Sequence, residues 1–256
     1  MLNFNKYLLQ EKILYDIEDD VEFLYSFFKD DIEEIERTGM LKENMFPKRI
    51  ITTAQLTSDK AKKANKINPC NIHINDFVGL FTSYFFYKPK QDNNDISIIG
   101  MRIHKNAFNL IIKDTKGDLN IASEHYSGIE KEFTSTKIKG SIRHELTHWI
   151  DDTFNNSNIK NILKNNGVMK KMKHKGYDNV NLLSFEIYAI LQNIYQLKLD
   201  NSDIWDEITF DEMIYMINSL GSIKKNTSKK DFDIWKRKIK RKMYKEGILG
   251  KNMINK

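Results

Sequence analysis

Residues 144–148 read H-E-L-T-H, and three of these side chains have the types and spacing needed for metal chemistry. His144 and His148 are four residues apart, so on a helix their imidazoles lie one turn apart on one face and can bind one divalent cation. Glu145 lies beside that face, where its carboxylate can accept a proton from a water molecule at the metal. The segment therefore predicts a zinc-binding helix with Glu145 as the general base.

The residues around this motif predict the helix that must position it. Apolar side chains recur at helical spacing, on a stripe distinct from that of the two histidines: Ile138, Ile142, Leu146, Trp149 and Ile150. This stripe predicts the buried face of the helix, and we interpret Trp149 as a core residue rather than a substrate contact. Gly140 and Ser141 predict the start of the helix, which should continue to about Asp152.

A catalytic zinc usually has three protein ligands, so a third ligand must be found outside the motif. The longer pattern H-E-x-x-H-x-x-G-x-x-H is absent, because Phe154 stands where its third histidine would be. Glu186 is the preferred candidate, because it shares a mostly apolar stripe of a second predicted helix, where a buried carboxylate is costly unless paired or metal-bound. Asp178 and His174 are alternatives, and a solvated Glu186 in a first helical turn would need no metal.

A helix with H-E-x-x-H, followed by a second helix that presents a glutamate, resembles the gluzincin branch of the zincin metallopeptidases. Residues 142–151 and 186–189 are similar to small metallopeptidases encoded by bacteriophages, and the resemblance covers roughly residues 95 to 200. It implies that His144, His148 and Glu186 bind Zn²⁺, that Glu145 is the base, and that the substrate is a protein or peptide.

The resemblance also implies a residue that stabilises the oxyanion, since gluzincins often use a tyrosine or histidine for this purpose. Tyr188 is counted with Glu145 among the candidate catalytic residues, while Tyr177 and His174 are alternatives for the oxyanion role. Asp151 or Asp152 could orient a ligand imidazole, or could equally be solvated acids at the end of a helix.

Charge is segregated along the chain, which has a net charge of +6. Residues 16–36 are rich in acids, whereas residues 229–245 are rich in lysine and arginine. We favour a solvated amphipathic helix for the basic tail, with a buried stripe of Phe232, Trp235, Ile239 and Met243. The alternative is that the tail binds nucleic acid or an acidic partner.

Three other function classes stay open beside a zinc peptidase. The first is a metal-dependent hydrolase of a different bond. The second is a catalytically inactive, metal-containing structural or binding protein. The third is a nucleic-acid-binding module that uses the basic C-terminal helix.

Length and composition limit the number of domains and the compartments that the chain fits. The 256 residues suffice for one substantial domain with appendages, and Cys70 is the only cysteine, so no intrachain disulfide can form. No signal peptide and no apolar run of about 18 residues is evident. We therefore expect a cytoplasmic protein without a membrane partner, in the host cytoplasm if the chain is encoded by a phage.

The predicted fold is α+β and zincin-like: a small β-sheet packed on the motif helix, followed by a mostly helical C-terminal half. We expect an acidic N-terminal helical appendage (1–46), a catalytic domain (47–200) and C-terminal helices with the basic tail (201–256). Residues 49–56 and 96–100 predict strands, and residues 58–66 a helix or loop. Residues 108–113 and 119–123 predict a hairpin about the turn 114–118, which could pair with an extended substrate.

Overall fold

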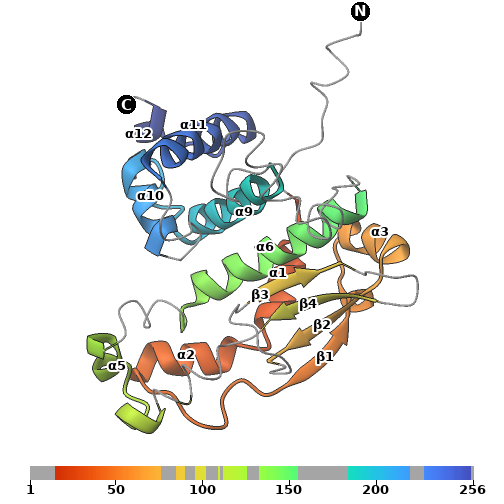
Figure 1. The fold of residues 1–256 in the computed structure, drawn as a ribbon, viewed down its shortest axis with the longest axis vertical. Helices are drawn as coiled ribbons and strands as arrows, with labels where there is room; N and C mark the ends of the chain where they lie inside the picture. The colour runs from red at the N-terminus through yellow and green to blue at the C-terminus, as the bar shows by residue number, and fades with distance from the viewer. Residues whose placement is uncertain are drawn as a thin grey trace, which may run out of the picture.

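A computed structural model of the chain describes residues 15–75, 85–89, 96–101, 109, 112–125, 133–154, 184–219 and 228–254. These residues form an α+β structure, as predicted (Figure 1). The helices are α1 (Glu18–Tyr25), α2 (Lys29–Thr38), α3 (Asp59–Ile67), α5 (Leu119–His125), α6 (Ser135–Phe154), α9 (Ser184–Asp200), α10 (Phe210–Ser219), α11 (Lys229–Glu246) and α12 (Lys251–Ile254). The strands are β1 (Arg49–Thr52), β2 (Cys70–Ile74), β3 (Phe85–Lys88) and β4 (Ser97–Met101), and Thr53–Gln55 forms the short 3-10 helix η2.

The four strands form one mixed sheet in the order β1-β2-β4-β3. The two central strands are parallel, and each edge strand is antiparallel to its neighbour. Alternate residues of the central strands are buried, among them Ile72 and Ile74 of β2 and Ile99 and Met101 of β4. This alternation places one apolar face of the sheet against the rest of the core.

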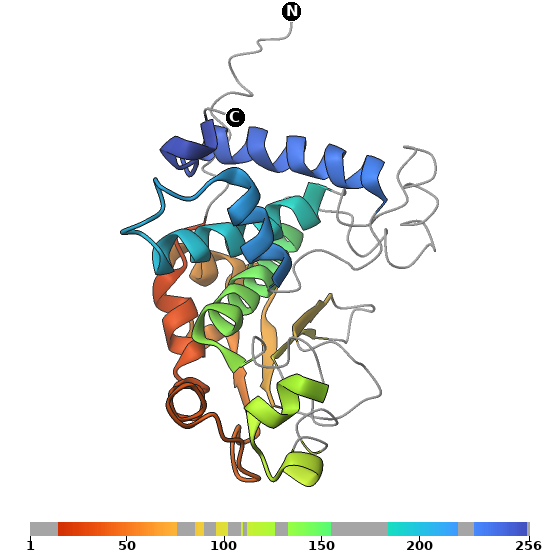
Figure 2. The ribbon, with the colours of Figure 1, turned by 90° about the vertical axis from the view of Figure 1, so that its left-hand side faces the viewer.

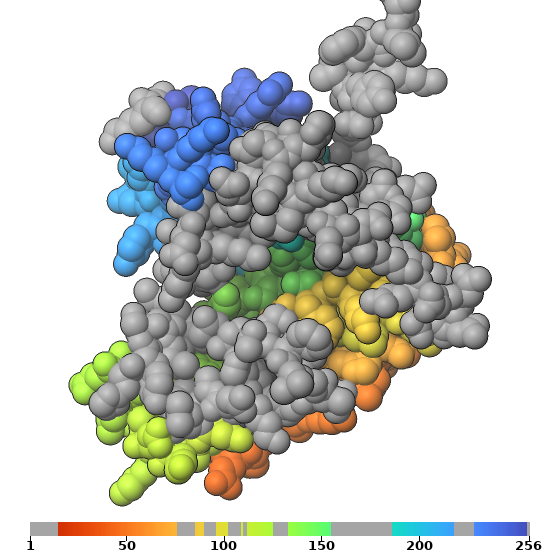
Figure 3. All heavy atoms as spheres, viewed as in Figure 1, coloured from red at the N-terminus to blue at the C-terminus, as the bar shows by residue number. Residues whose placement is uncertain are grey.

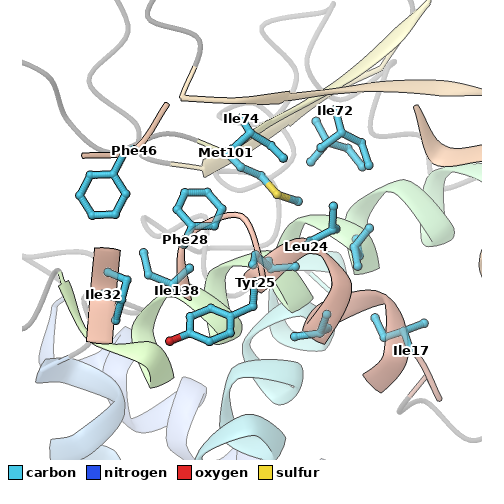
Figure 4. Close-up of a cluster of buried hydrophobic side chains, with 14 of the residues drawn as sticks. Ile17, Leu24, Tyr25, Phe28, Ile32, Phe46, Ile72, Ile74, Met101 and Ile138 are labelled. Atoms are coloured by element: carbon cyan, nitrogen blue, oxygen red, sulfur yellow. The ribbon is translucent and has the colours of Figure 1, made fainter. Parts of the chain in front are cut away.

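Helix α1 and the turn after it cover that apolar face together with α6, and buried side chains of α2 belong to the same hydrophobic cluster. Figure 4 shows Leu24 and Phe28, from α1 and the turn after it, directed toward Ile72, Ile74 and Met101 of the sheet. All five side chains are completely buried. The N-terminal helices therefore share one hydrophobic cluster with the sheet and α6.

Helix α6 lies between the sheet and the C-terminal helices (Figures 1 and 2). All five side chains of its predicted apolar stripe are at most 1% exposed, and Trp149 is a core residue, as expected. The predicted start at Gly140 and Ser141 is wrong, because the helix begins at Ser135 and the Thr134 hydroxyl accepts a hydrogen bond from the Lys137 amide at 3.3 Å. Thr134 is thus the residue that caps the helix.

The C-terminal helices form a second hydrophobic cluster. It extends from Ile187 to Met253 and is built from α9, α10, α11 and α12, with Trp205 and Trp235 almost fully buried. The first cluster extends from Ile17 to Ile150. The division of the chain at residues 46 and 200 stays a prediction.

The predicted hairpin after β4 is wrong. Residues 112–115 are helical and residues 119–125 form α5, whereas a hairpin would need strands there. The turn itself was located correctly, since Lys116 and Gly117 have positive φ angles of 54° and 87°. The Asp118 carboxylate then accepts hydrogen bonds from the Asn120 and Ile121 amides, so Asp118 caps a helix instead of closing a hairpin.

The basic tail forms the amphipathic helix that we favoured. Helix α11 starts after Ser228, whose hydroxyl accepts a hydrogen bond from the Asp231 amide, and ends at Gly247 with a positive φ of 67°. Its buried side chains include Trp235, Ile239 and Met243. Within the described part of the chain, no helix is both long enough and apolar enough to cross a membrane.

Candidate metal centre

The two histidines of the motif converge on one point from consecutive turns of α6. Their Nε2 atoms are 3.0 Å apart, and the rings meet edge to face with centroids separated by 4.7 Å. The rings could not approach in this way on a strand, where residues four apart are about 13 Å apart. The helical spacing of the motif therefore does produce a pair of converging nitrogen donors.

Glu186 completes the group from the first turn of α9. Its Oε2 atom is 3.8 Å from Nε2 of His144 and 3.9 Å from Nε2 of His148. Among the described residues, His144, His148 and Glu186 form the group of three or more ligand-type side chains that could hold a metal ion. The preferred third ligand thus lies beside the two histidines.

The distances between the three donor atoms, Nε2 of His144, Nε2 of His148 and Oε2 of Glu186, suit a small ion with tetrahedral coordination. Two ligands about 2.1 Å from zinc, at the tetrahedral angle, are about 3.4 Å apart. The three distances of 3.0, 3.8 and 3.9 Å each differ from that value by a few tenths of an ångström. Two imidazoles and one carboxylate are also a donor set common in catalytic zinc sites.

Burial keeps both imidazoles neutral, which is the form that binds metal. Desolvation, with the neighbouring charges of His148 and Lys137, holds the pKa of His144 well below its usual value. Desolvation lowers the pKa of His148 to about 4. The three side chains are nevertheless 18%, 10% and 22% exposed, so the site is open to solvent.

Glu145 is buried beside these ligands and makes a contact with the sheet. Desolvation and the repulsion of the nearby Glu186 raise its pKa to about 8, while a hydrogen bond to the Tyr87 backbone acts in the opposite direction. Because a carboxylate can only accept, the donor in that hydrogen bond to the ionised form is the Tyr87 amide. A cation held by Glu186 would offset the repulsion and favour ionised Glu145.

The hydrogen bond from Tyr87 shows how β3 is oriented toward α6. In a strand, the amide and carbonyl of one residue point to the same side, so both groups of Tyr87 lie on the outer edge of β3. The inner edge of β3 pairs with β4, with Tyr87 opposite Ile99. On the face shown in Figure 3, atoms of α6 (green) and of the strands β3 and β4 (yellow) lie side by side.

Residues of α9 other than Glu186 hold the first imidazole. The His144 ring makes a hydrogen bond to the Ala189 backbone that raises its pKa, so the ring is the donor. The Asn193 amide nitrogen lies 3.5 Å from His144 Nδ1. If Nδ1 is the nitrogen that donates to Ala189, the lone pair of Nε2 is left for the metal, and the Asn193 amide nitrogen, itself a donor, is only a neighbour of Nδ1.

Gly140 and Arg143 fix the approach of α9 to α6. A Cβ at Gly140 would lie 3.5 Å from the Asn193 side chain, so a larger side chain there would push the helices apart. The fully buried Arg143 donates to Gln196 of α9 at 3.2 Å and forms a salt bridge with Glu18 of α1. These contacts connect α9 and α1 to the helix that contains both histidines.

The structure does not support a catalytic role for Tyr188. Two residues along a helix correspond to a rotation of about 200°, so Tyr188 points away from the face occupied by Glu186. Its hydroxyl accepts a hydrogen bond from Lys242 of α11 at 2.7 Å, and its ring packs against the second cluster. Tyr188 therefore connects α9 to α11 and is not retained as an oxyanion donor.

Asp151 and Asp152 make contacts with other parts of the core. Asp151 accepts a hydrogen bond from the Tyr15 hydroxyl, and Asp152 accepts one from the Tyr87 hydroxyl at 2.7 Å. These bonds connect the end of α6 to the N-terminal segment and to β3. The alternatives Asp178, His174 and Tyr177 lie outside the described residues.

Sequence reasoning missed three residues of the site: Tyr87, Asn193 and Arg143. Asn193 had a signal, because it lies seven residues after Glu186 and so shares its helix face. Nothing in the local sequence marks Arg143 or Tyr87. Arg143 joins helices and the Tyr87 amide bonds to Glu145 only through contacts between residues far apart in the chain.

A comparison of the chain with protein-family models, curated proteins and solved structures finds no match.

Proposed function

We propose that this protein is a zinc-dependent peptidase with a gluzincin-like ligand set and a zincin-like fold. The observation on which the proposal rests is the convergence of His144, His148 and Glu186 from two helices, next to the buried carboxylate of Glu145. Two neutral imidazoles and a carboxylate favour Zn²⁺ over Mg²⁺ or Ca²⁺, which prefer oxygen ligands.

The roles of the protein groups follow from their positions. When bound, zinc would supply Lewis acidity that activates water and polarises the scissile carbonyl. Glu145 accepts the proton of the attacking water and passes it to the leaving amine. The Tyr87 amide holds the Glu145 carboxylate in place, and the Ala189 backbone accepts a hydrogen bond that orients the His144 ring.

An extended polypeptide is the substrate that best fits the neighbouring strand. The outer edge of β3 presents the Tyr87 carbonyl next to Glu145, so a peptide could add to the sheet there by main-chain hydrogen bonding. This assigns to β3 the role that the sequence suggested for residues 108–126. Extended peptides should therefore be cleaved faster than single amides that lack flanking residues.

The test combines metal content with turnover. Purified wild-type protein should contain about one zinc per chain and cleave members of a peptide library. Glu145→Gln should retain zinc and lose activity by a factor of about 10²–10⁴, since it removes the general base. The matched control is Glu207→Gln, which makes the same change at an exposed position of the C-terminal half and should leave activity unchanged.

Two results would overturn the proposal. Wild-type protein that holds no zinc, with His144→Ala changing neither metal content nor stability, would eliminate the site. Stoichiometric zinc without turnover of any substrate would instead indicate a structural metal centre, and turnover of small esters without turnover of any peptide would indicate a hydrolase of another class.

A further inference from the structure

Helix α11 has a charge that the proposed peptidase chemistry does not use. Its 18 residues include nine lysines and arginines and three acids, which gives a net charge of +6. This equals the net charge of the whole chain, so the remaining 238 residues are balanced. The net positive charge of the protein is therefore accounted for by one helix.

The apolar side of α11 is already occupied. Trp235, Ile239 and Met243 are at most 1% exposed and belong to the second hydrophobic cluster. An amphipathic helix that binds a lipid bilayer inserts its apolar face into the acyl region. That face of α11 is not accessible, so only its outer, basic side can meet a partner.

The outer side combines cations with an exposed aromatic ring. Arg237, Lys240, Arg241 and Tyr244 follow the helical spacing i, i+3, i+4, i+7, and they line a shallow pocket of about 350 Å³ with Leu249 and Ile254. Tyr244 is 71% exposed and Ile254 is 55% exposed. The pocket thus has a basic wall along α11 and an apolar wall formed by the segment that follows.

The two arginines of this pocket differ from neighbouring lysines on the same helix. Lys236 forms a salt bridge with Asp211 at 2.7 Å, and Lys242 donates to the Tyr188 hydroxyl. Both side chains therefore have partners within the protein. Arg237 and Arg241 are exposed, and neither forms a salt bridge with the residues that the structure describes.

We propose that this face of α11 binds single-stranded nucleic acid. The two arginines suit backbone phosphates, which they can contact bidentately, and Tyr244 with the apolar wall suits an unstacked base. A duplex keeps its bases stacked inside and would leave the pocket unused. An acidic peptide would satisfy the cations but would supply no ring to stack on Tyr244.

The proposal is tested by fluorescence anisotropy with a labelled 20-nucleotide single strand and with the same sequence as a duplex. Wild-type protein should bind the single strand more tightly than the duplex, and the affinity should fall steeply between 50 and 200 mM salt. Arg237→Gln with Arg241→Gln should lower the affinity for the single strand about tenfold or more. Tyr244→Ala should lower it about fivefold or more, with little effect on the duplex.

The matched control is Lys229→Gln with Lys230→Gln. It removes the same charge from exposed positions of the same helix, outside the pocket, and should weaken binding less than the arginine pair. Ultraviolet crosslinking of a bromodeoxyuridine strand to wild-type protein should recover a peptide that contains Tyr244, which tests the site without any variant.

Several outcomes would overturn the proposal. The first is that wild-type protein binds no single strand at 50 mM salt, and the second is that it binds the duplex as tightly as the single strand. The third is that the arginine pair and the lysine pair lose equal affinity, and the fourth is that the crosslinked peptide does not contain Tyr244. Preferential binding to phosphatidylserine vesicles or to polyglutamate would assign the face to a membrane or to an acidic polypeptide instead.

Discussion

The sheet half and the C-terminal helical half of the molecule contribute to the candidate metal centre in different ways. The sheet half, whose cluster includes the buried stripe of α6, supplies both histidines from one helix. The helical half, whose cluster includes the buried side chains of α9, supplies only Glu186. Two of the three ligands are therefore fixed by local geometry, and the third depends on how the halves pack.

The contacts between α6 and α9 explain how that packing is achieved. Gly140 lets α9 come close, and Arg143 bonds to Gln196 on the facing helix. The same contacts bring Ala189 and Asn193 to the His144 ring. A divalent ion at the site would connect the two halves, and the following predictions test this dependence.

Glu186→Ala should cause the largest loss of metal binding that any change in the helical half can produce. Removing a hydrogen-bonding partner of a ligand typically costs 10- to 100-fold in affinity, so removal of a ligand should cost about a thousandfold or more. Competition with a chromogenic chelator measures the affinity. Glu207→Ala is the control, and a Glu186→Ala protein with wild-type affinity would show that α6 alone holds the metal.

Zinc should stabilise the protein because it binds the folded state across both halves. At a free concentration about a thousand times its Kd, a ligand contributes about 4 kcal/mol. For a chain of this size, that corresponds to an increase in Tm of roughly 8–16 °C. Thermal melts with zinc and with a chelator measure the difference, which Glu186→Ala should abolish. An equal increase in that variant would contradict a metal link between the halves.

The metal-free protein should lose stability in mild acid through the histidines of the sheet half. The pKa of His148 is lowered to about 4 in the folded state, against about 6.5 when unfolded. Its neutral form therefore contributes stability above pH 6.5 that is lost as the pH falls toward 4. Between pH 7 and pH 5 the loss should be about 2 kcal/mol.

Urea unfolding of the metal-free protein at several pH values measures this loss, with His148→Gln as the comparison. The raised pKa of Glu145 has the opposite effect on stability, because protonation of Glu145 stabilises the folded state as the pH falls. Glu145 is present in both proteins, so the difference between them reports His148 together with its effect on the pKa of the neighbouring His144. If the free energy of unfolding changes with pH in the same way in both proteins, the assignment of a buried neutral imidazole to His148 is wrong.

Gly140→Ala should have the smallest effect and should be stabilising. Alanine favours a helix interior by up to about 1 kcal/mol relative to glycine, and the added Cβ would lie at an ordinary contact distance of 3.5 Å from Asn193. Gly140→Leu should instead displace α9, lowering both stability and zinc affinity. Chemical unfolding and chelator competition on both variants measure these changes, and equal behaviour of Ala and Leu would show that the helices are not closely packed there.

The sequence predicted most helices of the described chain because each has a local signal. The apolar stripe of α6 and that of α11 both have a period of about 3.6 residues. The stripe of α6 is buried as expected, and that of α11 is buried at Trp235, Ile239 and Met243, whereas Phe232 is only partly buried. The error at the start of α6 arose because Gly140 was interpreted as a break. In the structure it is an interior glycine whose small size serves a contact with a helix about 50 residues away.

The sheet was predicted less well because short apolar segments do not distinguish a strand from a helix. Residues 97–101 form a strand, as expected, and the strand predicted over residues 49–56 ends at Thr52, where η2 begins. The segment that follows the turn at Lys116 and Gly117 is α5. Asp118 can either complete a turn or cap a helix, and its local sequence fits both. The pairing order of the strands had no signal in the sequence at all.

The sequence by itself determined the pair of histidines, because four residues along any helix bring two side chains onto one face. It also proposed Glu186, from a carboxylate on an apolar stripe, but the distance of Glu186 from the imidazoles was decided by the packing of α9 on α6. The hydrogen bond from Tyr87 to Glu145 was likewise decided by the position of β3 at the edge of the sheet. Local periodicity acts over one or two helical turns, whereas contacts between residues 40 to 60 positions apart exist only after the hydrophobic clusters have formed.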